Sequence, residues 1–315
     1  MNTHSGLAAG RSRSPRSFSA RKVMSIRQGE IMWGYILIAP TVIGLGVFYL
    51  WPVVQTLYIS MTKQGPFGGS SWVGISNFER LATPEFGQSL LNTLGYTAIV
   101  VFLGVPVATV LAAMLSTTKL RFRVFYRAAF FIPVITLPAA IGVLWRWIYN
   151  TDYGILNQIL RFFGLNGSSW ISDPNIALYS IAMVGVWMTV GYNIVIIAAG
   201  IQEVPAWYHE AAMLDGAGAV RRFFSITLSA ISPTLFFVTV LAMIKALQVF
   251  DIVYLMVGDT SPAFDRVKPI VYYFYQSGFI ENDKGFAAAV AIVLFILIAS
   301  LTGVQFWIQK KWVQR

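Results

Sequence analysis

The chain has 315 residues, of which 57% are hydrophobic and 11% are charged, and its mean hydropathy is +0.65. A soluble domain usually carries about 25% charged residues, so lipid is the expected solvent for this much apolar surface. The absence of cysteine and the presence of two histidines exclude disulfides, Cys-ligated metals and multi-histidine sites. We therefore expect a membrane protein without a metal site.

The first segment, residues 1–30, is rich in serine, glycine and basic residues and is poor in core-forming residues. Such a composition cannot offset the entropy of ordering, which predicts a disordered basic tail. The net charge of +10 could suggest nucleic acid, but the charge lies in short tails and loops between apolar runs, so it indicates membrane orientation and no nucleic-acid partner. The next apolar run is too long for a signal peptide.

Residues 31–315 form the predicted membrane domain. Six segments are long enough to cross about 30 Å of hydrocarbon, and the prolines inside them are tolerated in lipid. The sequence therefore predicts an all-α polytopic protein of the plasma or inner membrane with six transmembrane helices. The six segments are approximately Ile31–Val54, Leu90–Leu115, Ala128–Tyr149, Ile176–Ile201, Ile231–Val257 and Gly285–Ile308.

Basic residues in the tails and connections indicate the orientation. One side has fifteen: Arg11, Arg13, Arg16, Arg21, Lys22, Arg27, Lys119, Arg121, Arg123, Arg127, Arg221, Arg222, Lys310, Lys311 and Arg315. The opposite side has seven: Lys63, Arg80, Arg146, Arg161, Arg266, Lys268 and Lys284. Because positive charge accumulates on the cytoplasmic side, both termini are expected to be cytoplasmic.

The connection at about residues 202–230 is longer than a minimal loop. Pro205 suits the first turn of a helix, Trp207–Leu214 has good helix formers, and Asp215-Gly216 ends the run. A second amphipathic stretch, Val220–Leu228, leads into the fifth segment. The pattern predicts a cytoplasmic helix–turn–helix, for which composition alone leaves open an interfacial hairpin that lies on lipid headgroups.

This connection resembles the EAA loop of ATP-binding-cassette (ABC) importer permeases. The matching residues, in the family's order and spacing, are Glu210, Ala211, Ala212, Gly216, Ile226 and Leu228, with Ser229 where the family usually has proline. The segments Leu247–Asp251 and Trp72–Gly74 resemble the carbohydrate-type permeases, the maltose, multiple-sugar and glycerol-phosphate group. The resemblance covers residues 30–310.

The resemblance implies a transport subunit that is not itself an enzyme and that imports a sugar or related polar solute. Its expected partners are a second EAA-bearing permease, two cytoplasmic ATPase subunits, an extracytoplasmic solute-binding protein and membrane lipid. ATP would be bound by the ATPase subunits, because no phosphate-binding glycine loop is present here, and this chain is expected to need no cofactor. The coupling residues implied are Glu210, Ala211, Ala212, Asp215, Gly216, Ile226 and Leu228.

Polar residues inside the fourth and fifth segments are candidates for the substrate pathway. A lysine in the middle of a span costs about 2.5–3.5 kcal/mol, so Lys245 is not expected to face lipid. It is either half of a structural ion pair, with Asp251 or a partner permease, or part of a substrate pathway that also includes Gln248 and Asp251. Thr189, Tyr192 and Asn193 lie about ten residues before the cytoplasmic end of the fourth segment, and Gly185, Thr189 and Tyr192 share one helix face. Ordinary helix packing is the alternative for that face.

Three other functions are alternatives. A glycerol-phosphate or polyol permease is the nearest alternative to a sugar permease. A stand-alone secondary transporter would show inverted repeats or several buried ionisable residues. A membrane enzyme would need a cluster of His, Asp or Glu, and the acids of this sequence are scattered.

Overall fold

The computed structural model describes residues 20–64, 69–116 and 121–313, and it divides into two compact units, Met1–Gln55 and Thr56–Arg315. Helix α1 (Ala20–Leu45) and the π-helical turn η1 (Gly46–Leu50) belong to the first unit, and α2 (Trp51–Ser60) continues into the second. Helix α1 begins inside the segment expected to be a disordered tail, whereas residues 1–19 lie outside the described part of the chain. By length and composition, Glu30–Ser60 can cross a membrane.

The second unit opens with a β-hairpin, which the all-α prediction did not include. Strand β1 (Thr62–Gln64) pairs antiparallel with β2 (Ser70–Trp72), so that Thr62 lies opposite Trp72. Each strand has three residues and lies between the long apolar segments. Hydropathy over a membrane-length window does not register strands this short.

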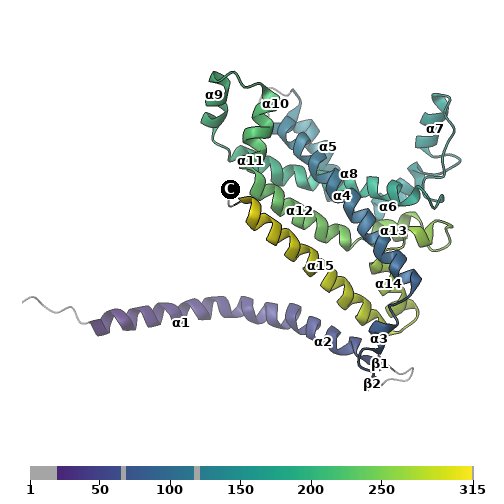
Figure 1. Cartoon of the computed structure of the whole chain (residues 1–315), viewed down its shortest axis with the longest axis horizontal. Coiled ribbons are helices and arrows are strands. Elements are labelled where there is room, and N and C mark those ends of the chain that lie inside the picture. Colours follow the sequence, from purple (N-terminus) through teal and green to yellow (C-terminus); the bar gives the residue numbers. More distant parts are fainter. Residues whose placement is uncertain (1–19, 65–68, 117–120, 314–315) are drawn as a thin grey trace, which may run out of the picture. The chain divides into compact units, whose positions relative to one another are not determined.

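The rest of the second unit is helical, as Figure 1 shows. Its elements are α3 (Ser76–Glu79), α4 (Pro84–Ser116), α5 (Arg123–Ile135), α6 (Pro138–Ile148), α7 (Ile155–Phe162), α8 (Ala177–Gln202), α9 (Ala206–Leu214), α10 (Ala219–Arg222), η2 (Phe223–Thr227), α11 (Leu228–Ala230), α12 (Ser232–Leu247), α13 (Asp251–Met256), η3 (Phe264–Arg266), α14 (Ile270–Tyr275), η4 (Gln276–Ile280) and α15 (Lys284–Val313).

Four described helices are long and apolar enough to span a membrane, or six if each of two bent pairs is one span. The predicted third span, Ala128–Tyr149, is one of these pairs, because α5 and α6 meet at 104°. The predicted segment is therefore two helices with a sharp bend between them, and it is a single span only if the bent pair crosses the membrane as one unit. Leu137 precedes Pro138 and adopts ψ 132°, the extended conformation that a following proline favours. Pro138 then starts α6, where its missing N–H is not needed.

The predicted fifth span, Ile231–Val257, is also interrupted. Helix α12 ends at Leu247, and α13 begins at Asp251 after a non-helical break at residues 248–250. Lys245 therefore lies in the last turn of α12 rather than in the middle of a continuous helix. At the other end of α12, the run Ala219–Ala230 meets it at an angle of 71°.

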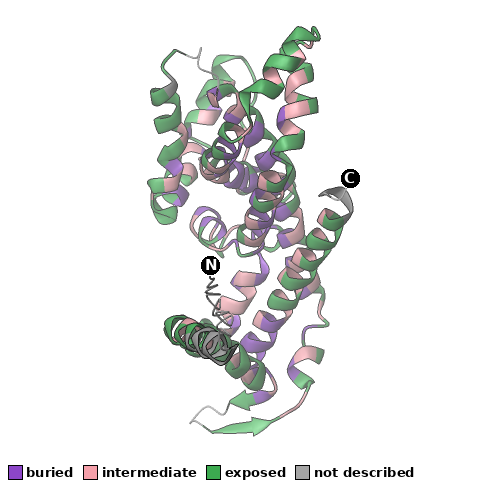
Figure 2. Ribbon diagram, turned by 90° about the vertical axis from the view of Figure 1, so that its left-hand side faces the viewer, coloured by how far each residue is buried: buried purple, intermediate pink, exposed green. Residues whose placement is uncertain are grey.

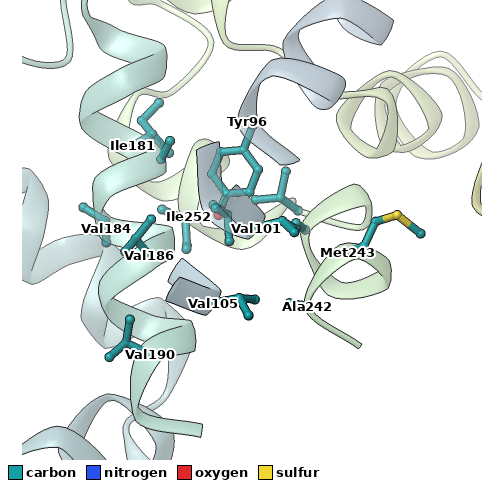
Figure 3. Packing of buried hydrophobic residues seen from close by; sticks show 14 of the residues in the cluster. Tyr96, Val101, Val105, Ile181, Val184, Val186, Val190, Ala242, Met243 and Ile252 are labelled. Carbon is teal, nitrogen blue, oxygen red and sulfur yellow. The ribbon is translucent and has the colours of Figure 1, made fainter. Parts of the chain in front are cut away.

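Helices α4 and α8 form the centre of the packed core. Buried residues of the second unit gather where its helices face one another, as Figure 2 shows. Tyr96 of α4 lies among side chains of α8, α12 and α13 (Figure 3). A Cβ on Gly185 would collide with the Tyr96 hydroxyl, and one on Gly191 would collide with the carbonyl oxygen of Phe130. These glycines let α8 approach α4 and α5 closely, as small residues do between membrane helices.

A polar joint connects the end of α2, the hairpin and the start of α15. The buried Asn77 amide donates hydrogen bonds of 2.9 Å to the carbonyl oxygens of both Ser60 and Thr62. Arg80 forms an ion pair of 2.8 Å with Asp283, just before α15. A Cβ on Gly285 would collide with the Thr62 carbonyl oxygen, so the backbones touch here. Because no residue larger than glycine fits at position 285, the joint fixes where α15 begins.

Candidate functional site

A cavity of about 410 Å³ lies in the second unit between α4, α8 and two helix breaks. One break separates α5 from α6, and the other separates α12 from α13. Non-helical backbone at membrane depth is tolerated where it lines a cavity, because its polar groups then need not face lipid. The two breaks therefore make this wall of the cavity more polar than intact helices would.

All six residues predicted for the substrate pathway line this one cavity. Helix α8 contributes three of them, α12 contributes one, and the α12–α13 break and the start of α13 contribute the others. They are Thr189, Tyr192, Asn193, Lys245, Gln248 and Asp251. Gly185 is also in the lining, one turn before Thr189, so the helix face inferred from the spacing is turned toward the cavity.

Lys245 is exposed to the cavity and lies against an aromatic ring. Its Nζ atom is 4.0 Å from the centre of the Tyr192 ring, a cation–π contact worth about 0.5–1 kcal/mol at an exposed site. The expected alternative, an ion pair with Asp251, is not formed. Within the described residues the one ion pair is that of Arg80 with Asp283. Lys245 and Asp251 therefore both present charge to the cavity.

Asn193 is the buried polar group of the cavity wall. Its side chain is 3% exposed, and its Nδ2 atom has no hydrogen-bond partner. The neighbouring Thr189 hydroxyl is already engaged, because it lies 3.0 Å from the Gly185 carbonyl oxygen and 3.1 Å from that of Val186. An unpaired buried amide is costly, so an acceptor that reached this donor would stabilise it.

Several lining residues were not found by sequence reasoning. Tyr96 comes from α4, and Pro133, Thr136 and Pro138 come from the α5–α6 break. The two prolines, five residues apart in one predicted span, were a usable signal, because proline-interrupted segments often form transporter sites. Tyr96 had no comparable signal, since its position depends on the packing of α4 against α8.

The predicted coupling residues form a helix and a tight turn at the end of the unit opposite α13 and α14 (Figure 1). Helix α9 carries Glu210 and Ala211, both exposed, and Ala212, which is half-buried. It ends in a Schellman motif: the Ala217 N–H donates to the Ala212 carbonyl oxygen at 2.9 Å, and the Gly216 N–H to that of Met213 at 3.1 Å. Gly216 has φ +78°, as this motif requires. The helix and its stop at Asp215-Gly216 were predicted correctly.

No residue of α9 is buried, and the helix exposes a cluster of large apolar side chains. The Trp207 and Tyr208 rings stack at 3.7 Å and are 59% and 45% exposed, and Leu214 is 90% exposed. An apolar cluster of this kind is typical of a surface that a partner covers.

The second part of the loop runs into α12. Ile226 and Leu228 are half-buried, and Thr227 between them is buried. The helix continues through Ser229, where the related permeases usually have proline, and the chain bends afterwards at Ile231. This part is therefore anchored in the helix bundle, while α9 is exposed. Helix α8 precedes the loop and α12 follows it, and residues of both helices line the cavity. These two helices therefore connect the loop to the cavity.

A comparison with known proteins identifies the family of this chain. The family described as "Binding-protein-dependent transport system inner membrane component" matches residues 86–314. The arabinooligosaccharides transport system permease protein AraP of Bacillus subtilis (strain 168) is 32% identical over 265 residues, which are 84% of each chain. The sn-glycerol-3-phosphate transport system permease protein UgpA of Agrobacterium fabrum is 34% identical over 284 residues, 88% of this chain and 94% of its own.

Solved structures agree on the fold. A bacterial ABC transporter involved in the import of the acidic polysaccharide alginate contains a chain that superposes with a TM-score of 0.78 at 19% identity. The match covers 92% of this chain and 99% of that one. The chain therefore belongs to the family of inner-membrane components of binding-protein-dependent transport systems, and it is a permease subunit of an ABC importer.

Proposed function

We propose that this permease passes a sugar or a related hydroxyl-rich solute through the cavity between α8 and α12. The observation that carries the proposal is Asn193, a residue of the cavity lining whose buried side-chain amide has no hydrogen-bond partner. Around it, the Tyr192 hydroxyl, Gln248 and Asp251 supply both donors and acceptors. A solute that both donates and accepts hydrogen bonds, such as a sugar, suits this mixture.

The importer proposed here contains a second EAA-bearing permease, two ATPase subunits and a solute-binding protein. The exposed apolar side chains of α9, with Glu210 beside them, suit a helix that inserts into a cleft of an ATPase subunit. Closure of the ATPases on ATP would move α9, and α8 and α12 would carry the movement to the cavity. The cavity would then open alternately to the two sides of the membrane.

A second solute class, glycerol phosphate or a similar anion, has one observation in its favour. The Lys245 ammonium group is exposed to the cavity and forms no ion pair. UgpA, one of the relatives above, belongs to an sn-glycerol-3-phosphate transport system. A phosphate group would provide the anionic partner for Lys245, whereas Asp251 in the same cavity opposes an anion. A neutral sugar is compatible with both charges.

The role of Asn193 is tested by the Asn193→Leu variant. Replacement of an unpaired buried amide by an apolar side chain of similar shape is close to neutral or stabilising. We therefore expect a normal yield and an unchanged or higher melting temperature of the importer complex, but uptake lowered about tenfold by the loss of one hydrogen bond to the solute. The measurement is ATP-driven uptake in proteoliposomes that contain loaded binding protein.

The control is the same substitution at Asn92, which is equally buried but has partners. Its Nδ2 atom donates to the carbonyl oxygens of Asp265 and Lys268, at 3.0 and 3.1 Å. Asn92→Leu should lower the yield of complex, because two partly buried hydrogen bonds to backbone carbonyls are lost. Normal uptake by Asn193→Leu would contradict the proposed role of the cavity.

We also propose six spans with both termini in the cytoplasm, which the distribution of basic residues supports. The cysteine-free chain permits a clean test with single cysteines and an impermeant thiol reagent. Asn166→Cys and Glu281→Cys should react from outside intact cells, whereas Ser225→Cys should not. All three positions are exposed, while Ser277 on the same outer segment is 3% exposed and is unsuitable. Labelling of position 225 from outside would contradict this topology.

A further inference from the structure

Four aromatic rings form a connected group that reaches from the cavity lining to the surface. We call this group, Phe250, Tyr254, Tyr275 and Phe279, the aromatic track. The Phe250 and Tyr254 rings stack with centres 5.4 Å apart and planes 10° apart. Phe250 also lies 5.2 Å from Tyr275, which in turn stacks on Phe279 at 5.7 Å and 22°. The rings come from the α12–α13 break, α13, α14 and η4, so the tertiary fold brings them together.

The aromatic track is continuous with the cavity at one end and exposed at the other. Phe250 lines the cavity, whereas Tyr254 is 39% and Phe279 is 71% exposed. The neighbouring Tyr272 differs, because it is 2% exposed and packs against Phe264 at 4.7 Å. Tyr272 is therefore part of the core, while the track rings keep surface that another group can cover.

The chemistry of the track suits sugar rings. A sugar ring has apolar C–H faces and polar edges, so it stacks on an aromatic face while its hydroxyls bond to groups at the rim. Tyrosine offers both an apolar ring and a hydroxyl on a side chain with little freedom to lose. Two carboxylates lie near the track: Asp251 is in the cavity lining, and Asp259 is close enough to Tyr254 and Tyr272 to act on both electrostatically. Burial raises the pKa of Tyr272, and the Asp259 carboxylate adds to the rise.

The size of the cavity indicates when the track would be used. Its volume of about 410 Å³ is near the lower end of the range of about 300–1,000 Å³ for small-molecule sites. A short sugar fits inside, but a longer oligosaccharide has to extend past the cavity wall. Phe250 lies on that wall, and the track continues from it.

We propose that the aromatic track is a second binding site, on which successive rings of an oligosaccharide stack beside the cavity. This inference rests on the proposed function in its sugar form. It predicts that the track affects long sugars more than short ones, because a single sugar ring can remain within the cavity.

The test compares the double variant Tyr254→Leu/Phe279→Leu with the wild type in the complete importer. The probes are arabinose and glucose and their di- and trisaccharides, supplied with saturating loaded binding protein. Leucine keeps an apolar side chain but removes the flat ring. Loss of two stacking contacts should lower the ratio of trisaccharide to monosaccharide uptake about five- to tenfold. The matched control is Tyr179→Leu, an exposed tyrosine of α8 that is not in the cavity lining, and it should leave this ratio unchanged.

Each other outcome overturns the inference in a distinguishable way. If the wild type takes up some of the sugars and the double variant has the same ratio of trisaccharide to monosaccharide uptake, the aromatic track is not a binding site, and the proposed function stands. If the double variant loses assembled complex while Tyr179→Leu does not, the exposed rings are a subunit interface instead. If the wild type takes up glycerol 3-phosphate but none of the sugars, the sugar form of the proposed function fails together with the track.

Discussion

A Gly216→Val permease is expected to reach the membrane in normal amount and to import no measurable solute. Gly216 has φ +78°, and a left-handed conformation costs a residue with a Cβ about 1–2 kcal/mol, more for a β-branched one. Nothing lies within 4 Å of the added Cβ, so the effect comes from the backbone and not from a collision. The Schellman turn would be lost, and α9 would no longer be held at its angle to α10. Uptake and co-purification of the ATPase subunits measure the result.

Gly218 provides the matched control. It is also a glycine with nothing within 4 Å of an added Cβ, but its φ is −66°. Gly218→Val should therefore retain most of the uptake. Glu210→Lys, which reverses an exposed charge on α9, should uncouple transport without a change in the turn. If Gly216→Val and Glu210→Lys both import at the wild-type rate, this loop is not the coupling element.

The Lys245→Met variant is expected to assemble normally and to lose about nine-tenths or more of its uptake of an anionic solute. No carboxylate lies within ion-pair distance of Lys245 in the described structure, so its removal leaves no newly unpaired buried charge. Methionine is flexible and packs well against a ring, so it can cover Tyr192. Yield therefore stays normal, while the cavity loses its cation. Uptake and yield of complex are measured on the same preparations.

Two controls separate the possible roles of Lys245. Lys284→Met removes an exposed lysine at the start of α15, outside the cavity lining, and should leave uptake unchanged. The double variant Lys245→Met/Asp251→Asn tests the ion pair. A low yield of Lys245→Met that the double variant restores would mean that the two residues pair in the assembled importer. Normal yield with normal uptake would exclude Lys245 from the pathway.

Much of the coupling loop could be predicted because its signals are local. The helix formers from Trp207 to Leu214 and the glycine at 216 specify a helix and its stop within a dozen residues. The α5–α6 break also has a local signal, since Pro138 favours an extended conformation for Leu137, the residue before it. Structure that depends only on residues close in the sequence can be predicted from a single sequence.

The α12–α13 break could not be predicted, because residues 248–250 contain neither proline nor glycine. Tertiary packing interrupts the helix there, and Asp251 favours a new helix start as an acidic first-turn residue. Asn193 was predicted from a depth count, and Lys245 from the cost of a charge inside a membrane span. Their missing hydrogen bond and ion pair became visible only in the folded chain. Tyr96 and Phe250 reach the cavity through contacts between distant segments, which no pattern in the sequence records.

The joint at the start of α15 makes this helix a lever. Its first turn is held by the backbone of Thr62 and by the Arg80–Asp283 ion pair, whereas Phe306, about 30 Å further along, meets Phe236 of α12 at 5.2 Å. A rotation of only about 10° around this fixed end would displace Phe306 by about 5 Å, roughly one helical turn. The largest displacement would thus fall beside the second turn of α12, shortly after the loop that contains α9, and the smallest at the β-hairpin.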